Sequence, residues 1–316
     1  MSNVSTREAY GRELVRLGDQ QPQVVVLDAD LSKSTMTTYF AQRFPERFFN
    51  MGIAEADLMG TAAGLATTGL VPFASTFAVF AAGRAFEQIR NSIAYTGLPV
   101  VVAATHAGLT VGPDGGSHQA IEDLALMRAL PGMTVLVPAD AREAAEMVQA
   151  AAVLGGPAYL RLGRTAVPEL LRSADYSFAV GRAELLIAGD DVAIFACGLM
   201  VQVALEAQRL LAEQKIFASV VNVSTIKPID VKAIVDTVIR TGCAVTVEEH
   251  SIIGGLGSAV AEVLSEHYPV PLWRVGVNDE FGQSGSPEEL LRHYGLLPEN
   301  VAAQAVRAWR RKRSDR

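Results

Sequence analysis

The chain has 316 residues, of which 50% are hydrophobic and 19% are charged, and its formal net charge is −7. This composition excludes a disordered chain, and the mild acidity argues against a surface built to bind nucleic acid. Two cysteines are too few for a disulfide framework or a thiolate metal site. The start lacks a signal peptide and no apolar run reaches the ~18 residues of a membrane span, so we expect a cytoplasmic protein with no membrane partner.

Short apolar runs rich in β-branched residues alternate with helical stretches through the first half of the chain. We predict strands at 24–27, 98–103 and 134–138, and helices at 7–17, 55–68, 82–95, 120–129 and 141–153. Continuous apolar strands are buried on both faces, which is typical of a parallel sheet covered by helices.

The pattern loosens between residues 165 and 188, and we interpret this segment as a linker. Alternation then resumes, with strands predicted at 192–195, 218–222, 244–247 and 271–275 and helices at 200–213 and 258–267. The sequence therefore predicts two successive α/β domains, 1–164 and 189–316, each a mainly parallel sheet flanked by helices. We interpret the basic run at 310–313 as a solvated helix end.

A glycine-rich run at residues 251–258 imitates a nucleotide-binding loop. A single match of that kind is weak evidence. We interpret its glycines as a tight turn from a strand into a helix.

A loop of small residues at 105–119 follows a buried strand and carries His106, Asp114 and His118. The carboxyl ends of strands are where α/β sheets bind ligands, so these side chains are candidates for a binding site. The alternative is a plain turn in which Asp114 is the turn former.

Glu55 opens the helix predicted at 55–68, whose residues are small and mostly apolar, so we expect that helix to be deeply buried. Its carboxylate either stabilises the helix start or is kept dry to exchange a proton with a bound heterocycle. Phe77 and Phe80 follow a strand at positions i and i+3. They either belong to the core or form one wall of a pocket for a flat ring.

Taken together, in this order and spacing, the three motifs resemble the transketolase family of thiamine diphosphate enzymes. Gly52-Ile-Ala-Glu55 resembles the glutamate motif, residues 76–80 the aromatic motif and residues 105–118 the substrate loop. The resemblance covers a pyrimidine-binding domain followed by the family's C-terminal domain. The family's Gly-Asp-Gly signature for the diphosphate and metal is missing from the sequence. The resemblance therefore implies the C-terminal half of a split transketolase.

The resemblance also implies an activity, the transfer of a two-carbon ketol unit from a ketose phosphate to an aldose through the thiamine diphosphate ylide. It implies that Glu55 shares a proton with the pyrimidine ring and that His106 and His118 are catalytic. The residues with an implied coenzyme-binding role are Glu55, Phe77, Phe80 and Asp30. The residues with an implied substrate-binding role are Arg7, Ser34, His106, Asp114, His118 and Arg164, with Arg161 as a rival for Arg164.

A separate N-terminal-half subunit is implied as partner, binding Mg²⁺ or Ca²⁺ and the diphosphate in an α2β2 assembly. Three alternatives stay open: the beta subunit of a 2-oxo acid dehydrogenase decarboxylase component, a 1-deoxyxylulose-5-phosphate synthase-like enzyme, and a non-catalytic scaffold. The sequence departs from the family at Gly83, where a further aromatic is frequent, at Ala54 and Ala56 beside the glutamate, and at Gly116-Ser117. These departures leave open which sugars react and whether their terminal anion is phosphate or sulfonate.

Overall fold

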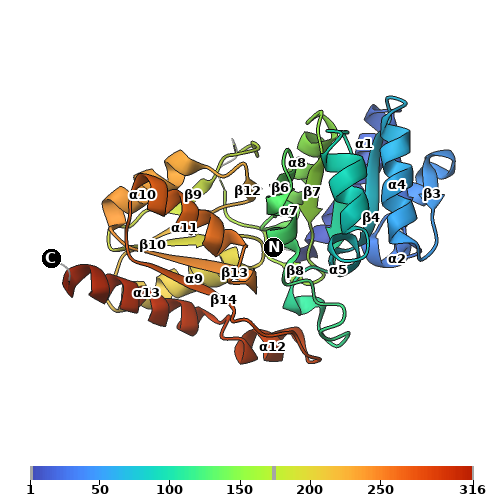
Figure 1. The fold of residues 1–316 in the computed structure, drawn as a ribbon. Coiled ribbons are helices and arrows are strands. Elements are labelled where there is room, and N and C mark those ends of the chain that lie inside the picture. Colours follow the sequence, from blue (N-terminus) through green and yellow to red (C-terminus); the bar gives the residue numbers. More distant parts are fainter. Residues whose placement is uncertain (1–2, 173–175, 315–316) are drawn as a thin grey trace.

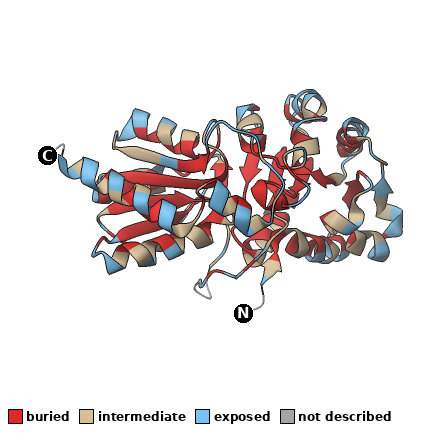
Figure 2. Cartoon of the chain, turned by 90° about the horizontal axis from the view of Figure 1, so that it is seen from below, coloured by how far each residue is buried: buried red, intermediate tan, exposed pale blue. Residues whose placement is uncertain are grey.

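The computed structural model describes residues 3–172 and 176–314 and shows two α/β domains side by side (Figure 1). Each domain is built on one mainly parallel sheet with helices on both faces, which confirms the predicted fold class. The strands are buried almost throughout, while the outer faces of the helices are exposed (Figure 2).

The first domain holds a seven-stranded sheet. In spatial order its strands are β12 (Thr225–Lys227), β6 (Thr134–Leu136), β7 (Ala158–Arg161), β5 (Val101–Thr105), β4 (Val71–Phe77), β2 (Val24–Asp28) and β3 (Phe48–Asn50). Every pairing is parallel except that of β12 with β6. Because β12 belongs to the second half of the chain, this pairing ties the two domains together.

Helices cover both faces of this sheet. On one face lie α1 (Thr6–Gln20), α3 (Thr38–Arg43) and α8 (Ala141–Ala152), and on the other lie α4 (Glu55–Ala66), α5 (Ala78–Ala82), the π-helix η2 (Ile89–Ala94) and α7 (Asp123–Ala129). The shorter turns are α2 (Ser32–Thr35), η1 (Pro45–Arg47), α6 (Phe86–Gln88) and η3 (Leu109–Val111). Ser5 and Asp140 cap α1 and α8 by accepting a backbone N–H in the first turn.

The second domain holds a five-stranded sheet. In spatial order its strands are β14 (Leu272–Val277), β13 (Ala244–Ser251), β10 (Val192–Ala196), β11 (Ala218–Asn222) and β9 (Glu184–Ile187), with β9 antiparallel. Helices α9 (Met200–Glu213) and α13 (Pro298–Ser314) cover one face, and α10 (Val231–Thr241) and α11 (Leu256–His267) cover the other. Helix α12 (Pro287–His293) packs on η3 of the first domain, below the main body in Figure 1.

Three predicted elements need correction. Of the helix expected at 82–95, only residues 86–94 are helical, as α6 followed directly by η2, because α5 ends at Ala82 and the chain turns at residues 83–85. The helix expected at 120–129 begins at Asp123, since Ala120 still bridges to Ala107 in extended backbone. The strand expected at 98–103 begins only at Val101, after Pro99, which has no N–H to donate.

Helix α4 also differs from expectation. It was predicted to be deeply buried, but only one of its sides is: Glu55, Leu58, Met59 and three alanines face the core. Its other side exposes Ala56, Gly60 and Gly64 to solvent. Small residues occur on both the buried and the exposed side of this helix, so they do not show which side packs against the domain.

The segment predicted as a linker carries two short strands, one for each half of the molecule. β8 (Ala166–Val167) pairs with β1 (Val4–Ser5), and β9 joins the second sheet. Residues 173–175 of this segment lie outside the described residues, and the domain limits 1–164 and 189–316 stay predictions. Within the described ranges, every helix is too short or too polar to span a bilayer, and the expected cytoplasmic location stays a prediction as well.

Candidate active site

The candidate residues gather at one edge of the first sheet. Strands β2, β4, β5 and β7 run parallel and end at this edge. Phe77 is the last residue of β4, and the loops after β2, β5 and β7 carry Asp30, His106 and Arg164. This edge is where a parallel sheet binds ligands, because the connecting loops diverge there.

Glu55 is the first residue of α4, and its side chain is only 3% exposed. Its two carboxylate oxygens lie 3.2 and 3.3 Å from Nη1 of Arg84, which donates to them. Arg84 follows the break after α5, and its own side chain is 55% exposed. A carboxylate at the start of a helix is favoured by the helix dipole. Here it also forms an ion pair with Arg84, whose side chain is half exposed.

Phe77 and Phe80 form an aromatic pair beside this carboxylate. Their rings are nearly parallel, at 11°, with centroids 5.9 Å apart. The Arg84 guanidinium lies over the Phe80 ring, with Cζ 4.1 Å from the centroid. A planar group that carries N–H donors therefore already stacks on Phe80 and donates to Glu55. An aminopyrimidine is also planar, and its ring nitrogen donates an N–H when protonated, so Glu55 and the aromatic pair fit the pyrimidine of thiamine diphosphate.

Asp30 lies in the loop after β2, in left-handed backbone with φ 62°. Its Oδ1 accepts from Nδ2 of Asn50, at 2.9 Å, on the adjacent strand β3. The structure thus places Asp30 at the correct edge of the sheet with an exposed carboxylate, while its bonding partner is Asn50.

His106 lies between the aromatic pair and a cluster of arginines. Its ring stacks on Phe77, with centroids 3.9 Å apart. Nε2 lies 3.4 Å from Nη1 of Arg7 and Nδ1 lies 2.9 Å from Oγ1 of Thr105. Because a guanidinium can only donate, Nε2 carries the lone pair and Nδ1 carries the proton. Burial and the charges of Arg7 and Arg164 lower the pKa of His106 to about 3, so the ring is neutral.

Arg7 comes from the start of α1 and is held over the site by Ser34, whose carbonyl oxygen accepts from Nη1 at 2.6 Å. Burial lowers the pKa of Arg7, and the charge of Arg164 lowers it further. The buried Nε of Arg7 has no hydrogen-bond partner among the described residues. An unpaired donor on a guanidinium is suited to an anion.

Arg164, Asp114 and His118 complete the set. Nη1 of Arg164 donates to the carbonyl of Val111 at 2.6 Å and lies 3.4 Å from Oδ2 of Asp114. The side chains of Arg164 and Asp114 are each 40% exposed. The His118 ring meets Phe80 edge-on, with centroids 5.4 Å apart. The loop at 105–119 therefore folds back over the aromatic pair.

Arg161, the rival of Arg164, is engaged elsewhere. Its Nε and Nη2 donate to the two oxygens of Asp123 at 2.8 and 3.0 Å. Nη2 also donates to the carbonyls of Ala120 and Glu249. Because Nε and Nη2 of this buried guanidinium already donate to protein groups, Arg164 is the better candidate for the anion ligand.

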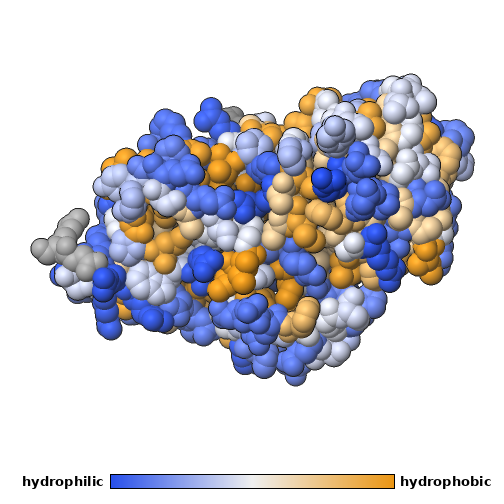
Figure 3. Space-filling model, viewed as in Figure 1, coloured by the Kyte–Doolittle hydropathy of each residue, from blue (hydrophilic) through white to orange (hydrophobic). Residues whose placement is uncertain are grey.

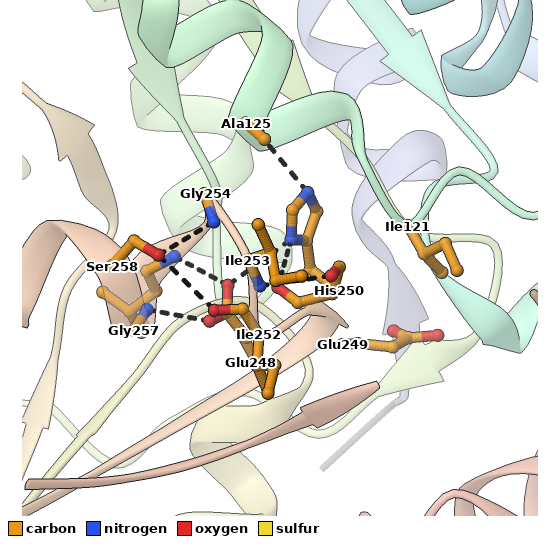
Figure 4. Close-up of polar contacts among 12 residues, drawn as sticks. Ile121, Ala125, Glu248, Glu249, His250, Ile252, Ile253, Gly254, Gly257 and Ser258 are labelled. Atoms are coloured by element: carbon orange, nitrogen blue, oxygen red, sulfur yellow. Dashed lines mark hydrogen bonds and ion pairs between the residues drawn. The ribbon is translucent and has the colours of Figure 1, made fainter. Parts of the chain in front are cut away.

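The glycine-rich run at 251–258 is a turn, as interpreted from the sequence. The carboxylate of Glu248 in β13 accepts the backbone N–H groups of Leu256 and Gly257 at the start of α11, at 2.6 and 2.7 Å (Figure 4). A Cβ on Gly255 would lie 2.0 Å from this carboxylate. The chain's own side chain fills the position where a nucleotide phosphate would bind.

Sequence reasoning missed two residues that bear on this site, Arg84 and Glu249. No spacing rule links Arg84 to Glu55, since the two lie on different elements. For Glu249 a signal existed, because two adjacent acidic residues interrupt an otherwise apolar strand at 244–250. Buried acids are unusual and call for a partner.

Comparison with known families gives two matches. Residues 2–169 match the model described as the transketolase pyrimidine binding domain, and residues 181–301 match that of the transketolase C-terminal domain.

Individual relatives cover the chain almost completely. A putative transketolase C-terminal section from Methanocaldococcus jannaschii is 47% identical over 302 residues, 95% of each chain. A 6-deoxy-6-sulfo-D-fructose transketolase subunit from a Clostridium species is 40% identical over 306 residues, 97% of this chain and 95% of that one. The 1-deoxy-D-xylulose-5-phosphate synthase of Symbiobacterium thermophilum is 38% identical, and the chain spans 47% of its length.

Among solved structures, a split-gene transketolase described as an inactive beta4 tetramer is 58% identical, with a TM-score of 0.91 over 97% of this chain and 98% of that one. The Pichia stipitis transketolase in complex with sedoheptulose 7-phosphate has a TM-score of 0.84 at 25% identity. That match covers 99% of this chain and 47% of the Pichia chain.

Proposed function

This chain belongs to the transketolase family, and we propose that it is one subunit of a two-chain transketolase that moves a two-carbon ketol unit from a ketose phosphate to an aldose. One observation carries the proposal. Phe77 stacks on Phe80, beside the buried carboxylate of Glu55, and on His106, beside the arginines. A coenzyme site and an anion site therefore share one aromatic wall.

Thiamine diphosphate, the coenzyme of this family, supplies when bound a carbanion that adds to the ketose carbonyl. Glu55 would hold a proton at the ring nitrogen of the pyrimidine, for which a buried carboxyl is suited. Phe77 and Phe80 would exclude water from the face of that ring, and Asp30 would line the pocket. Arg84 would have to leave Glu55 for the ring to approach.

The substrate half is assigned to the charged residues. Arg7, Arg164 and the Ser34 hydroxyl would bind the terminal anion of the donor, since paired guanidinium groups suit a phosphate or a sulfonate. His106 would orient that end of the sugar as a neutral ring. The relative that acts on a sulfo-sugar makes both anions worth testing on this site.

His118 and Asp114 would face the reacting end of the sugar. His118 stands over Phe80, close to where the coenzyme would lie. Asp114 would accept a hydrogen bond from a sugar hydroxyl in place of its contact with Arg164. A carboxylate and an imidazole can hold sugar oxygens and pass a proton between them.

The partner-facing surface is assigned to the exposed side of α4. A Cβ added to Gly60 or Gly64 would meet nothing within 4 Å, so a second backbone can approach closely. Nearby, Ile53 is 77% and Tyr95 86% exposed, and Figure 3 shows pale and orange residues among the blue ones over the first domain. We assign to this side an N-terminal-half subunit that binds the diphosphate with Mg²⁺ or Ca²⁺ in an α2β2 assembly.

The test is reconstitution. The purified chain, a subunit carrying the Gly-Asp-Gly half, and their mixture are each assayed with thiamine diphosphate and Mg²⁺ for ketol transfer from a phosphorylated ketose to an aldose. We expect turnover from the mixture alone. Turnover by the single chain would overturn the partner requirement.

The same assay separates the alternatives. Carbon dioxide release from a 2-oxo acid, without ketol transfer, would favour the 2-oxo acid dehydrogenase or deoxyxylulose phosphate synthase class. If the chain changes neither coenzyme binding nor turnover of its partner, it is a scaffold.

A further inference from the structure

The loop that carries the substrate residues has an unusual backbone. Four of its residues have positive φ: His106 at 57°, Gly108 at 82°, Gly112 at 83° and Gly115 at 76°. Positive φ is uncommon for a residue other than glycine, so His106 has a strained backbone. Several contacts to the loop at 105–119 come from the other domain.

Glu249 supplies the central contact. It lies in β13 of the second domain, is 6% exposed, and its Oε1 accepts the backbone N–H of Thr110 at 2.5 Å. A Cβ on Gly108 would lie 2.5 Å from the Glu249 carboxyl carbon, so the carboxylate lies directly against the loop backbone. In Figure 4 the Glu249 side chain points toward the stretch that holds Ile121, away from Glu248 and His250.

Two further contacts join the same surfaces. The N–H of Ser251 donates to the carbonyl of Ile121 at 2.7 Å, and Nε2 of Gln119 donates to the carbonyl of Gln283 at 3.0 Å. Both bonds cross from the second domain to the far end of the loop. The loop is therefore held along its length from outside its own domain.

The two adjacent acidic residues of β13, Glu248 and Glu249, accept hydrogen bonds from different domains. Side chains alternate along a strand, so Glu248 and Glu249 point to opposite faces. The hydrogen bonds that the Glu248 carboxylate accepts come from the start of α11 in its own domain. The contacts of Glu249 lie in the first domain: the Thr110 N–H accepted by its carboxylate, and Arg161, which donates to its backbone carbonyl and whose charge also acts on the carboxylate. Burial raises the pKa of Glu249, and a carboxyl is kept there despite that cost.

We infer that Glu249 is a positioning residue through which the second domain holds the substrate loop in the conformation that presents His106, Asp114 and His118 to the donor sugar. The inference rests on the proposed function of that loop. It gives the second domain a role in donor binding, although none of the proposed substrate residues belongs to it.

The role predicts a particular kinetic effect. Without Glu249 the loop populates other conformations, and the donor must select the competent one. If that population falls to about a tenth, the donor KM rises about tenfold while kcat at saturation stays within about twofold. Coenzyme affinity does not change, since Glu55, Phe77 and Phe80 lie on other elements.

The experiment uses the reconstituted two-subunit enzyme with three variants. E249A should raise the donor KM about tenfold. E249Q should restore most of the loss, because its amide oxygen can accept from Thr110. E248A, the matched control, removes an equally buried carboxylate and should lower the melting temperature without changing the donor KM.

A second readout is amide hydrogen exchange over residues 108–112, which should become faster in E249A and not in E248A. The inference is overturned if folded E249A keeps the wild-type donor KM and the wild-type exchange rate. It is also overturned if E249A lowers kcat and stability while the donor KM and the exchange over residues 108–112 stay unchanged. Absence of ketol transfer by the wild-type pair would instead overturn the proposed function, and the exchange measurement would still decide whether Glu249 holds the loop.

Discussion

The two halves of the candidate site are supported in different ways. Glu55, Phe80 and Arg84 of the coenzyme half are built from the first domain alone, next to the exposed side of α4. The substrate half has the second domain behind it, through Glu249 and the contact of Gln119 with Gln283. The coenzyme half borders an exposed surface, and the substrate half is closed by the chain itself.

This difference separates two kinds of defect. A change in the coenzyme half should alter the chemical step or coenzyme binding and leave recognition of the donor's anion intact. A change in the substrate half, or in the contacts behind it, should alter the donor KM and leave the coenzyme untouched. Variants that violate this division would show that the halves are one coupled unit.

The largest effect is expected at Glu55. E55Q removes the carboxyl that exchanges a proton with the pyrimidine, and loss of such a group costs about 10²–10⁴-fold in kcat. The donor KM should stay within about threefold, because the arginines are untouched. Steady-state kinetics of the reconstituted enzyme measure both. E46Q, which changes an exposed carboxylate on η1, is the control, and near-normal kcat in E55Q would refute the role.

The next effect is expected at the two arginines. Removing a charge-assisted hydrogen bond costs ~1.5–3 kcal/mol, so R7Q and R164Q should each raise the KM of a phosphorylated donor about 10–100-fold. A donor without a terminal anion should be used by the variants as by the wild type. R12Q, on the same helix as Arg7 but paired on the surface with Glu8, should behave as wild type. An equal loss with both donors would contradict the assignment.

A smaller effect, opposite in direction, is expected at Arg84. Because its guanidinium occupies both Glu55 and the Phe80 face, it competes with the pyrimidine. R84L should raise the affinity of the two-subunit enzyme for thiamine diphosphate about 3–10-fold, as expected for loss of an ion pair whose cation is half exposed and of a cation–π contact. Calorimetric titration measures this, with R12L as the matched ion-paired control. Weaker binding in R84L would mean that Arg84 helps to hold the coenzyme.

How far the sequence predicts this molecule differs between its parts. Where apolar runs are continuous and helices amphipathic, even the limits agree: the strand predicted at 218–222 is β11, and the helix predicted at 200–213 is α9. The helix predicted at 82–95 begins only at Phe86, because a turn at residues 83–85 separates it from α5. This turn is also the segment that delivers Arg84 to Glu55.

The candidate site shows the same limit. The resemblance supplied ten site residues, and the structure places the His106 ring against both Arg7 and Phe77. It could not supply Glu249, whose partner Thr110 lies 139 positions earlier in the chain. An acidic residue in a buried strand signals that a partner exists, but only the packing of the two domains identifies it.

The smallest effect is expected at Glu248, whose carboxylate accepts hydrogen bonds from its own, second domain. Burial raises the pKa of this carboxyl from 4.5 to about 7, against the two N–H groups that it accepts. Below pH 4.5 the carboxyl is protonated in both the folded and the unfolded chain. Between 4.5 and 7 only the unfolded chain loses the proton, so the contribution of Glu248 to stability is lost as the pH rises through this window.

E248Q cannot titrate, so its melting temperature should decline less than that of the wild type between pH 5 and 7, by a few degrees. E266Q is the control and should follow the wild-type curve. It changes an exposed carboxylate on α11, the helix whose first N–H groups Glu248 accepts. The donor KM of E248Q should stay at the wild-type value at every pH. A changed donor KM in E248Q would mean that Glu248 and Glu249 both position the loop at 105–119. The assignment of Glu248 to the second domain and of Glu249 to the loop would then be wrong.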